Sequence, residues 1–193
     1  MTPEADPIAL FQTLFDEARS KEPHDVTAMT LATADVQGRP SARMVLLKGV
    51  DARGFTFFTN RDSRKGGDLL VNPFAALCLH WPASELQIRV EGPVELVSDE
   101  ESDAYFATRA RESQLGAWAS QQSAPLASRE ALEARVRELD ARYPTVVPRP
   151  PFWGGYRVVP AAMEIWRAGP ARLHDRFRYT RAPAGWTVER LNP

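Results

Sequence analysis

The sequence has very few of the residues on which disulfide frameworks and metal sites depend. Cys78 is its single cysteine, so no disulfide can form within the chain and the framework of a small secreted domain is excluded. Its segment, AALCLHW, is apolar, and we interpret Cys78 as a small buried residue rather than a nucleophile. The three histidines are far apart and lack a spaced set of Cys, Asp or Glu partners. We therefore expect no metal site.

Other common signatures are missing too. The chain has no G-x-S-x-G, G-x-x-x-x-G-K or G-x-G-x-x-G motif, which excludes the usual hydrolase, P-loop and Rossmann interpretations. No apolar run approaches the length of a membrane span, and MTPEADPIALF lacks the basic and apolar regions of a signal peptide. The net charge is -1, from 24 Lys+Arg and 25 Asp+Glu, which does not suit coating DNA or an anionic membrane. We expect a cytoplasmic protein that binds neither nucleic acid nor membrane.

What is present indicates a globular protein made mainly of strands. The chain has 193 residues, of which 44% are hydrophobic and 25% charged, enough for one domain with a core. Helices are predicted to begin after three capping residues, Asp6, Ser98 and Ser128. Strand-like segments lie between turn residues: AMTLAT, ARMVLLKGV, FTFFT, AALCLHW, QIRVEGPVEL, GGYRVVP, MEIWRA, RLHDRFRYT and WTVERL.

The connectors between these segments indicate antiparallel pairing. DVQGRP, DARG, AGPA and RAPAG are short and rich in Gly, Pro and Asp, as hairpin loops are. The Pro-rich stretch 144–151 reads as an extended connector rather than a domain boundary. We predict a mainly β fold with peripheral helices, an antiparallel barrel formed by a single domain over residues 1–193.

Several basic segments are candidates for binding anions. Arg43 and Lys48 bracket an apolar strand, and five residues apart they would point to opposite faces of a regular strand. Arg64 and Lys65 precede two glycines and an apolar run that resembles a helix start, where backbone N–H groups and cations suit a phosphate. The alternatives are a core strand with charged ends for Arg43 and Lys48, and a solvated turn for Arg64 and Lys65.

A second group of polar residues follows at helical spacing. Tyr105, Arg109 and Ser113 stand at i, i+4 and i+8, so a continuous helix would present two hydroxyls and a guanidinium on one face. These donors suit a phosphate monoester, although a solvated helix face is the alternative. Gln122 and Ser123 add neutral donors and acceptors beside a turn.

The segment ARLHDRF raises the same question near the C-terminus. Arg172, His174 and Arg176 fall at alternate positions, so a regular strand would place all three on one face. An anion between them would explain the arrangement. A salt-bridged edge strand explains it as well.

Taken together, these motifs resemble a known family. RMVLLK, FTN…SRK, YFATRARESQLGAWAS-QQS, PPFWGGYRV and RLHDRF occur in the order seen in the pyridoxamine/pyridoxine 5′-phosphate oxidases, from about Thr27 to the C-terminus. The resemblance implies an FMN-binding split β-barrel that forms a homodimer with its active sites at the interface. It also implies an N-terminal helical segment, 1–26, and C-terminal strands, 152–193, that complete the barrel and the active site.

The resemblance also implies roles for individual residues. The residues that would hold the substrate phosphate are Lys48, Tyr105, Arg109 and Ser113. Arg172 and His174, as the catalytic pair, would lie against the pyridine ring on the side away from the flavin. The residues expected to contact FMN are Arg43, Met44, Val45, Leu46, Leu47, Lys48, Phe58, Thr59, Arg64, Lys65, Gln87, Gln122, Ser123, Trp166 and Arg176.

The implied reaction oxidises pyridoxamine 5′-phosphate or pyridoxine 5′-phosphate to pyridoxal 5′-phosphate, a step of vitamin B6 metabolism, with FMN taking a hydride and oxygen giving hydrogen peroxide. Two alternatives stay open: a related flavin oxidase acting on another ring, such as a phenazine precursor, and a non-catalytic FMN-binding module. The sequence departs from the family pattern at Leu86, where Arg is common, at Phe58, where Tyr is common, and in the Gly-poor segment 167–171.

Overall fold

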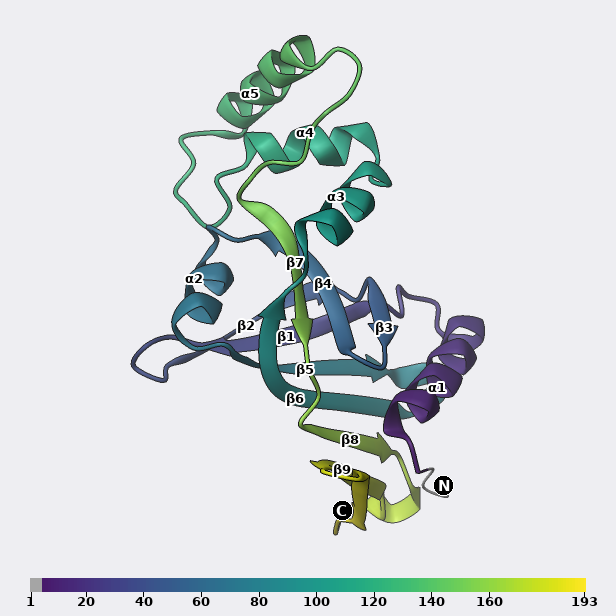
Figure 1. Ribbon diagram of the computed structural model, residues 1–193. Coiled ribbons are helices and arrows are strands. Elements are labelled where there is room, and N and C mark those ends of the chain that lie inside the picture. The colour runs from purple at the N-terminus through teal and green to yellow at the C-terminus, as the bar shows by residue number, and fades with distance from the viewer. Residues whose placement is uncertain (1–4) are drawn as a thin grey trace.

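The computed structural model describes residues 5–193, so the first four residues of the predicted segment 1–26 lie outside the described part. Within it the chain forms ten β-strands and five α-helices (Figure 1). The strands are β1 (Ala28–Ala34), β2 (Pro40–Leu46), β3 (Gly49–Asp51), β4 (Gly54–Asn60), β5 (Phe74–Trp81), β6 (Leu86–Leu96), β7 (Trp153–Val158), β8 (Ala162–Arg167), β9 (Asp175–Ala182) and β10 (Gly185–Arg190). The helices are α1 (Pro7–Lys21), α2 (Arg64–Val71), α3 (Asp99–Ala107), α4 (Arg111–Ala119) and α5 (Arg129–Arg142).

The long strand β6 connects the two parts of a curled antiparallel sheet. Its first half pairs with β8, from Leu86 to Glu91, and its last residues pair with β7. The main strand order is β10-β9-β8-β6-β5-β1-β2, while β7 pairs with both β6 and β4, and β4 with β3. A Cβ at Gly92 would lie 2.0 Å from the Val159 carbonyl oxygen, so glycine permits this close approach between the two parts. The predicted barrel is confirmed as an open, split one. The strands after residue 152 belong to the same sheet, while the single-domain boundary 1–193 stays a prediction.

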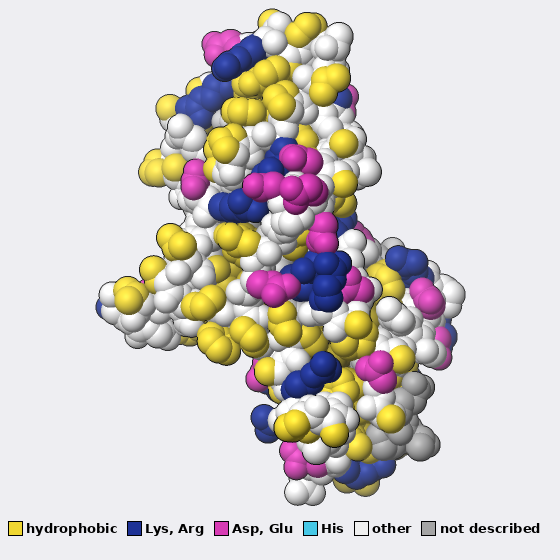
Figure 2. All heavy atoms as spheres, in the orientation of Figure 1, with side chains coloured by type: hydrophobic (Ala, Val, Ile, Leu, Met, Phe, Trp, Pro, Cys, Tyr) yellow, Lys and Arg dark blue, Asp and Glu magenta, His cyan; other side chains and the backbone are white. Residues whose placement is uncertain are grey.

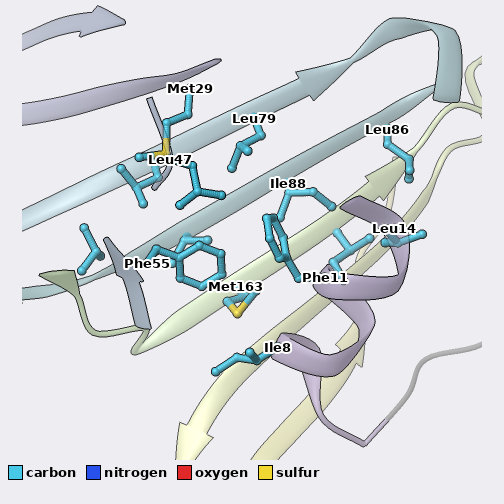
Figure 3. Close-up of a cluster of buried hydrophobic side chains, with 14 of the residues drawn as sticks. Ile8, Phe11, Leu14, Met29, Leu47, Phe55, Leu79, Leu86, Ile88 and Met163 are labelled. Atoms are coloured by element: carbon cyan, nitrogen blue, oxygen red, sulfur yellow. The ribbon is translucent and has the colours of Figure 1, made fainter. Parts of the chain in front are cut away.

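Helix α1 packs its apolar face against the inside of the sheet. Asp6 caps this helix by accepting a hydrogen bond from the Ile8 backbone N–H at 2.9 Å, as the sequence predicts. Phe11, 1% exposed, meets the Phe55 ring edge-on, with 4.9 Å between the ring centroids. Figure 3 shows Ile8, Phe11 and Leu14 of α1 beside labelled side chains of the strands. The helix therefore covers one side of the barrel core.

Helices α3, α4 and α5 pack outside the barrel, at the end of the molecule shown uppermost in Figure 1. Ser98 caps α3 and Ser128 caps α5, since their hydroxyls accept hydrogen bonds from backbone N–H groups at 3.2 Å. A second buried cluster, Phe106, Leu115, Val147 and Trp153, holds α3 and α4 against the start of β7. Because α3 joins β6 through a single short connection, this helical layer has a fixed position relative to the sheet.

Two segments differ from the predicted secondary structure. The helix expected to run from Tyr105 to Ser113 is interrupted after Ala107, because i→i−3 hydrogen bonds tighten the chain and Ala110 is extended (φ -55°, ψ 141°). The strand expected from Arg172 begins only at Asp175. Ala171 and Arg172 have φ of 53° and 65°, so the chain makes a tight turn there instead of extending.

The segment RMVLLK also departs from a regular strand. β2 ends at Leu46, and the backbone then changes partner. The Leu47 N–H donates to the Thr27 carbonyl, whereas the Lys48 N–H donates to the Thr56 carbonyl of β4, both at 2.8 Å. Arg43 and Lys48 therefore do not belong to one strand, and the expectation that they mark its opposite faces is wrong.

Acidic and basic side chains are mixed on the face shown in Figure 2. Several ion pairs hold α3 against neighbouring segments of the chain. Arg149 pairs with Asp99 and Asp103 of α3, and Arg157 of β7 pairs with Glu95 and Glu101, at distances of 2.6–2.9 Å. Among residues 5–193, no helix is both long enough and apolar enough to cross a membrane.

Two adjacent glycines of α2 provide a test of the packing around this helix. A Cβ at Gly66 would lie 1.9 Å from the Arg61 carbonyl oxygen, whereas a Cβ at Gly67 meets nothing within 4 Å. We expect Gly66→Ala to lower the free energy of unfolding by about 1–3 kcal/mol. Gly67→Ala should raise it by up to about 1 kcal/mol, because alanine favours the helix. Urea unfolding of both variants measures this, and equal changes in the two would contradict the close approach.

Candidate active site

A cavity of about 640 Å³ lies between the sheet and the helical layer, a size typical of small-molecule sites. β2 and β4 form one side of it, and α3, α4 and the start of β7 form the other. Its lining residues are Met44, Val45, Leu46, Lys48, Phe58, Thr59, Asn60, Lys65, Tyr105, Arg109, Ala110, Ser113, Gly116, Ala117, Ser120, Gln122 and Trp153. In the part of the chain that the structure describes, no three His, Cys, Asp or Glu residues are placed to hold a metal ion.

The cavity brings together all four residues expected to hold the substrate phosphate. Lys48 comes from the crossing between β2 and β3, Tyr105 from α3, and Ser113 from α4. Arg109 lies in the turn between these two helices. The interruption of the predicted helix thus keeps its three polar residues around one space, although they no longer share a helix face.

Arg109 is a partly buried cation with an unsatisfied donor. Its guanidinium lies over the Trp153 ring at 4.8 Å and near the Phe106 ring at 5.5 Å. Its Nη1 atom is buried and has no hydrogen-bond partner among the described residues. Burial lowers the pKa of Arg109, since the charged form loses hydration. An anionic oxygen at this position would supply the missing acceptor.

Three aromatic rings make a flat surface beside Arg109. The rings of Phe58 and Tyr105 stack with centroids 4.1 Å apart, and Phe58 and Trp153 stack at 5.5 Å with planes within 11°. A Cβ at Gly155 would lie 2.8 Å from the Phe58 ring, so glycine leaves room for the stack. Phe58 itself lacks a hydroxyl, so this surface is more apolar than a tyrosine would make it.

A second positively charged position lies at the start of α2. Lys65 is buried, and its Nζ donates to three neutral oxygens: Thr59 Oγ1 at 3.2 Å, Ser63 Oγ at 3.0 Å and Gln122 Oε1 at 2.5 Å. Burial, together with the nearby Arg43, lowers the pKa of Lys65 to about 8. A desolvated ammonium surrounded by neutral acceptors is suited to an anionic ligand.

The neighbouring residues of this position include further members of the expected FMN set. The Arg64 backbone N–H donates to Ser123 Oγ at 3.2 Å, which ties the start of α2 to the loop after α4. Ser123 has φ of 75°, so the loop turns sharply there. Arg43 lies outside the cavity lining, and Leu47 is buried in the barrel core.

The remaining expected residues lie elsewhere, on β6, β8 and β9 and in the turn before β9. Gln87, Trp166 and Arg176 are aligned across these strands, and the His174 and Trp166 rings are 4.5 Å apart. None of these side chains lines the cavity. In Figure 1, β8 and β9 are at the end of the molecule opposite α3 and α4. Arg172 is exposed, and its turn means that the shared strand face expected for Arg172, His174 and Arg176 does not form.

Some lining residues were not expected from the sequence. Trp153 stands in the motif PPFWGGYRV, which could have signalled it, whereas Asn60 and Ser120 have no distinguishing pattern. Leu86 is fully buried in the core, so its departure from the family's arginine does not change the cavity lining.

The curled antiparallel sheet and its cavity define the class of fold. A pyridoxamine 5′-phosphate oxidase-related, FMN-binding protein from Nostoc punctiforme superimposes with a TM-score of 0.78, at 19% identity and covering 100% of both chains. The protein thus has the split β-barrel fold of this FMN-binding protein. Residues 15–143 match the family model described as "Pyridoxamine 5'-phosphate oxidase". Residues 153–193 match the "Pyridoxine 5'-phosphate oxidase C-terminal dimerisation region". The chain belongs to the pyridoxamine 5′-phosphate oxidase family.

Two relatives show how far the similarity extends. A pyridoxine/pyridoxamine 5′-phosphate oxidase from Anaeromyxobacter dehalogenans is 60% identical over 189 residues, which are 97% of this chain and 96% of the relative. The structure of PhzG from Burkholderia lata 383, in complex with tetrahydrophenazine-1-carboxylic acid, has a TM-score of 0.93 at 35% identity. It covers 99% of this chain and 94% of PhzG.

The lowered pKa of Lys65 predicts a specific pH dependence of stability in the flavin-free protein. Between about pH 8 and the ordinary lysine pKa of 10.5, the unfolded state binds more protons at Lys65 than the folded state does. The contribution of Lys65 to the free energy of unfolding therefore rises with pH in this window, by at most about 1.4 kcal/mol per pH unit.

Urea unfolding of the wild type and Lys65→Met from pH 7.5 to 10 measures this contribution. We expect the free energy of unfolding of the wild type to rise relative to that of Lys65→Met as the pH rises. Lys21→Met, at an exposed position on α1, is the matched control. A difference between wild type and Lys65→Met that stays constant with pH would contradict the prediction.

Proposed function

We propose that this chain is an FMN-dependent oxidase that converts pyridoxamine 5′-phosphate and pyridoxine 5′-phosphate to pyridoxal 5′-phosphate. The FMN would accept a hydride from the substrate C4′ atom and pass both electrons to oxygen, which with two protons gives hydrogen peroxide. Pyridoxine 5′-phosphate would yield the aldehyde directly, and the imine from pyridoxamine 5′-phosphate would take up water and release ammonia. The observation that carries this proposal is one cavity with two separate cationic positions, at Arg109 and Lys65, as two phosphorylated ligands require.

At the first position, Arg109 would bind the substrate phosphate. Its buried Nη1 would gain a charge-assisted hydrogen bond, and Lys48 would add a second positive charge. Tyr105 and Ser113 would donate hydroxyl hydrogens to the remaining oxygens. Because Trp153 holds the Arg109 guanidinium from one side, the arginine is oriented before the substrate arrives.

At the second position, Lys65 would bind the FMN phosphate, with Arg43 and Arg64 nearby. Thr59, Gln122 and Ser123 would complete this phosphate site, since they already surround the Lys65 ammonium or the start of α2. Met44, Val45 and Leu46 of β2 would lie along the flavin, where they line the cavity. The donor set fits the group, because a phosphate dianion would compensate a buried charge that has neutral partners in the protein.

A homodimer would complete the site. The residues of β6, β8 and β9 lie away from the cavity in one chain, and the C-terminal region matches a family region described as a dimerisation region. We propose that a second copy of this chain brings Arg172 and His174 over the substrate ring. Gln87, Trp166 and Arg176 of that copy would contact the flavin.

The similarity to PhzG supports one alternative, an oxidase acting on a phenazine precursor. Such a substrate carries a carboxylate in place of a phosphate, and its two oxygens would use fewer of the donors that Arg109, Lys48, Tyr105 and Ser113 place around the cavity. The phosphate-binding residues favour the pyridoxine substrates for this reason. A non-catalytic FMN-binding module is disfavoured, because it has no use for Arg172 and His174.

Purification followed by an oxidase assay tests the function. We expect a yellow protein with an FMN spectrum that forms pyridoxal 5′-phosphate and hydrogen peroxide from either substrate in the presence of oxygen. Forms of vitamin B6 without a phosphate, such as pyridoxine itself, should be turned over far more slowly, because Arg109 then has no anionic partner. A flavin-loaded protein that oxidises neither phosphorylated substrate would refute the proposal.

Mixed dimers test whether each site uses two chains. Arg109→Ala and Arg172→Ala should each be weakly active at low substrate concentration, with FMN still bound. Co-expressed at equal levels, they should regain about a quarter of wild-type activity, because half of the dimers then contain one intact site. Arg172 is exposed in the single chain, so its removal should not affect folding. Activity that remains at the level of the two parents would show that both residues act within one chain.

A further inference from the structure

We propose that Asp68 is a positioning residue for the FMN phosphate, acting through Arg43. This inference rests on the proposed function, since it takes FMN as the ligand at the start of α2. Asp68 lies on α2, is 7% exposed and does not line the cavity. Its carboxylate instead faces β1 and β2, where it organises the side chains that hold Arg43.

The contacts form a closed network across three elements. Asp68 Oδ2 accepts hydrogen bonds from Thr33 Oγ1 at 2.6 Å and from Ser41 Oγ at 3.1 Å. Arg43 donates to the same two hydroxyls, through Nη1 to Thr33 at 2.8 Å and through Nη2 to Ser41 at 2.5 Å. A third bond, from Nη1 to the Leu31 carbonyl at 3.2 Å, fixes the plane of the guanidinium.

The carboxylate determines the direction of these bonds. Each hydroxyl has a single hydrogen, and when that hydrogen is given to Asp68 the oxygen lone pairs are left for Arg43. Thr33 and Ser41 are cross-strand partners on β1 and β2, so both hydroxyls stand on the same side of the sheet, facing α2. Asp68 therefore makes two neutral side chains into acceptors for one guanidinium.

The network also has an electrostatic effect on the cations at the start of α2. Arg43, Arg64 and Lys65 are close enough to disfavour one another's charged forms: Arg64 lowers the pKa of Arg43, and Arg43 lowers that of Lys65. Asp68 acts in the other direction, since its carboxylate lies 3.7 Å from Arg43 Nη2 and favours the charged guanidinium. The aspartate thus offsets part of the repulsion among these cations when no phosphate is bound.

The aspartate could also weaken phosphate binding by repulsion, and this effect has the opposite sign. Its oxygen Oδ2 already accepts two hydroxyl hydrogens and lies against Arg43, which offsets much of its field. We therefore expect the loss of Arg43 positioning to outweigh the relief of repulsion when the charge is removed.

Flavin affinities of the Asp68→Asn variant test the inference. The flavin-free protein is titrated with FMN and with riboflavin, which lacks the phosphate, and the quenching of flavin fluorescence gives both dissociation constants. We expect FMN affinity to fall about tenfold while riboflavin affinity is unchanged. Asp62→Asn, which removes an exposed carboxylate just before α2, is the matched control and should change neither constant.

Other outcomes would overturn the inference. Tighter FMN binding in Asp68→Asn would show that repulsion dominates, and an equal loss for both flavins would show a general structural role. In an Arg43→Ala background, Asp68→Asn should not weaken FMN binding further, and a further tenfold loss there would show that Asp68 does not act through Arg43. A wild type that binds FMN but oxidises neither phosphorylated substrate would refute the proposed function and leave these affinity ratios measurable.

Discussion

The pairing of β6 with two sets of neighbours is the constraint on which the rest of the structure depends. The first half of this strand pairs with β8, in the strand order that ends at β10, and its last residues pair with β7. The change occurs around Gly92, where a side chain would collide with the Val159 carbonyl. Because α3 follows β6 directly, this curl also places the helical layer over β2 and β4. The cavity is the space that remains between them.

Within that space, positive charge is buried without carboxylate partners among the described residues. Lys65 is surrounded by hydroxyls and an amide, and Arg109 lies against aromatic rings. Such groups cost free energy in the folded protein, since desolvation is not offset by an opposite charge. A site of this kind stabilises anions strongly once they enter. Asp68 illustrates how this cost is limited, because its carboxylate offsets the positive charge of Arg43 from outside the cavity.

Local patterns in the sequence predicted much of the architecture. Strand-like segments bounded by turn residues located the strands, and the capping residues Asp6, Ser98 and Ser128 located three helix starts. The predictions failed where tertiary contacts overrule local preference. The helix through Arg109 is interrupted by tight turns, and the strand before Asp175 is replaced by a turn with positive φ. The connector AGPA indicated a turn before Asp175, but neither spacing nor propensity showed that this turn includes Arg172 or that α3 ends at Ala107.

The sequence by itself determined which chemical groups are available: cations and hydroxyls in family order, a single cysteine and no metal-binding set. Only the tertiary structure decided which of them meet. Strand register brings Thr33 opposite Ser41 and thereby both of them to Asp68, a relation that no motif contains. The curl of the sheet separates Trp166 and His174 from the cavity. The physical reason is that hydrogen-bond register and chain crossing depend on the whole sheet, whereas residue type and spacing are local properties.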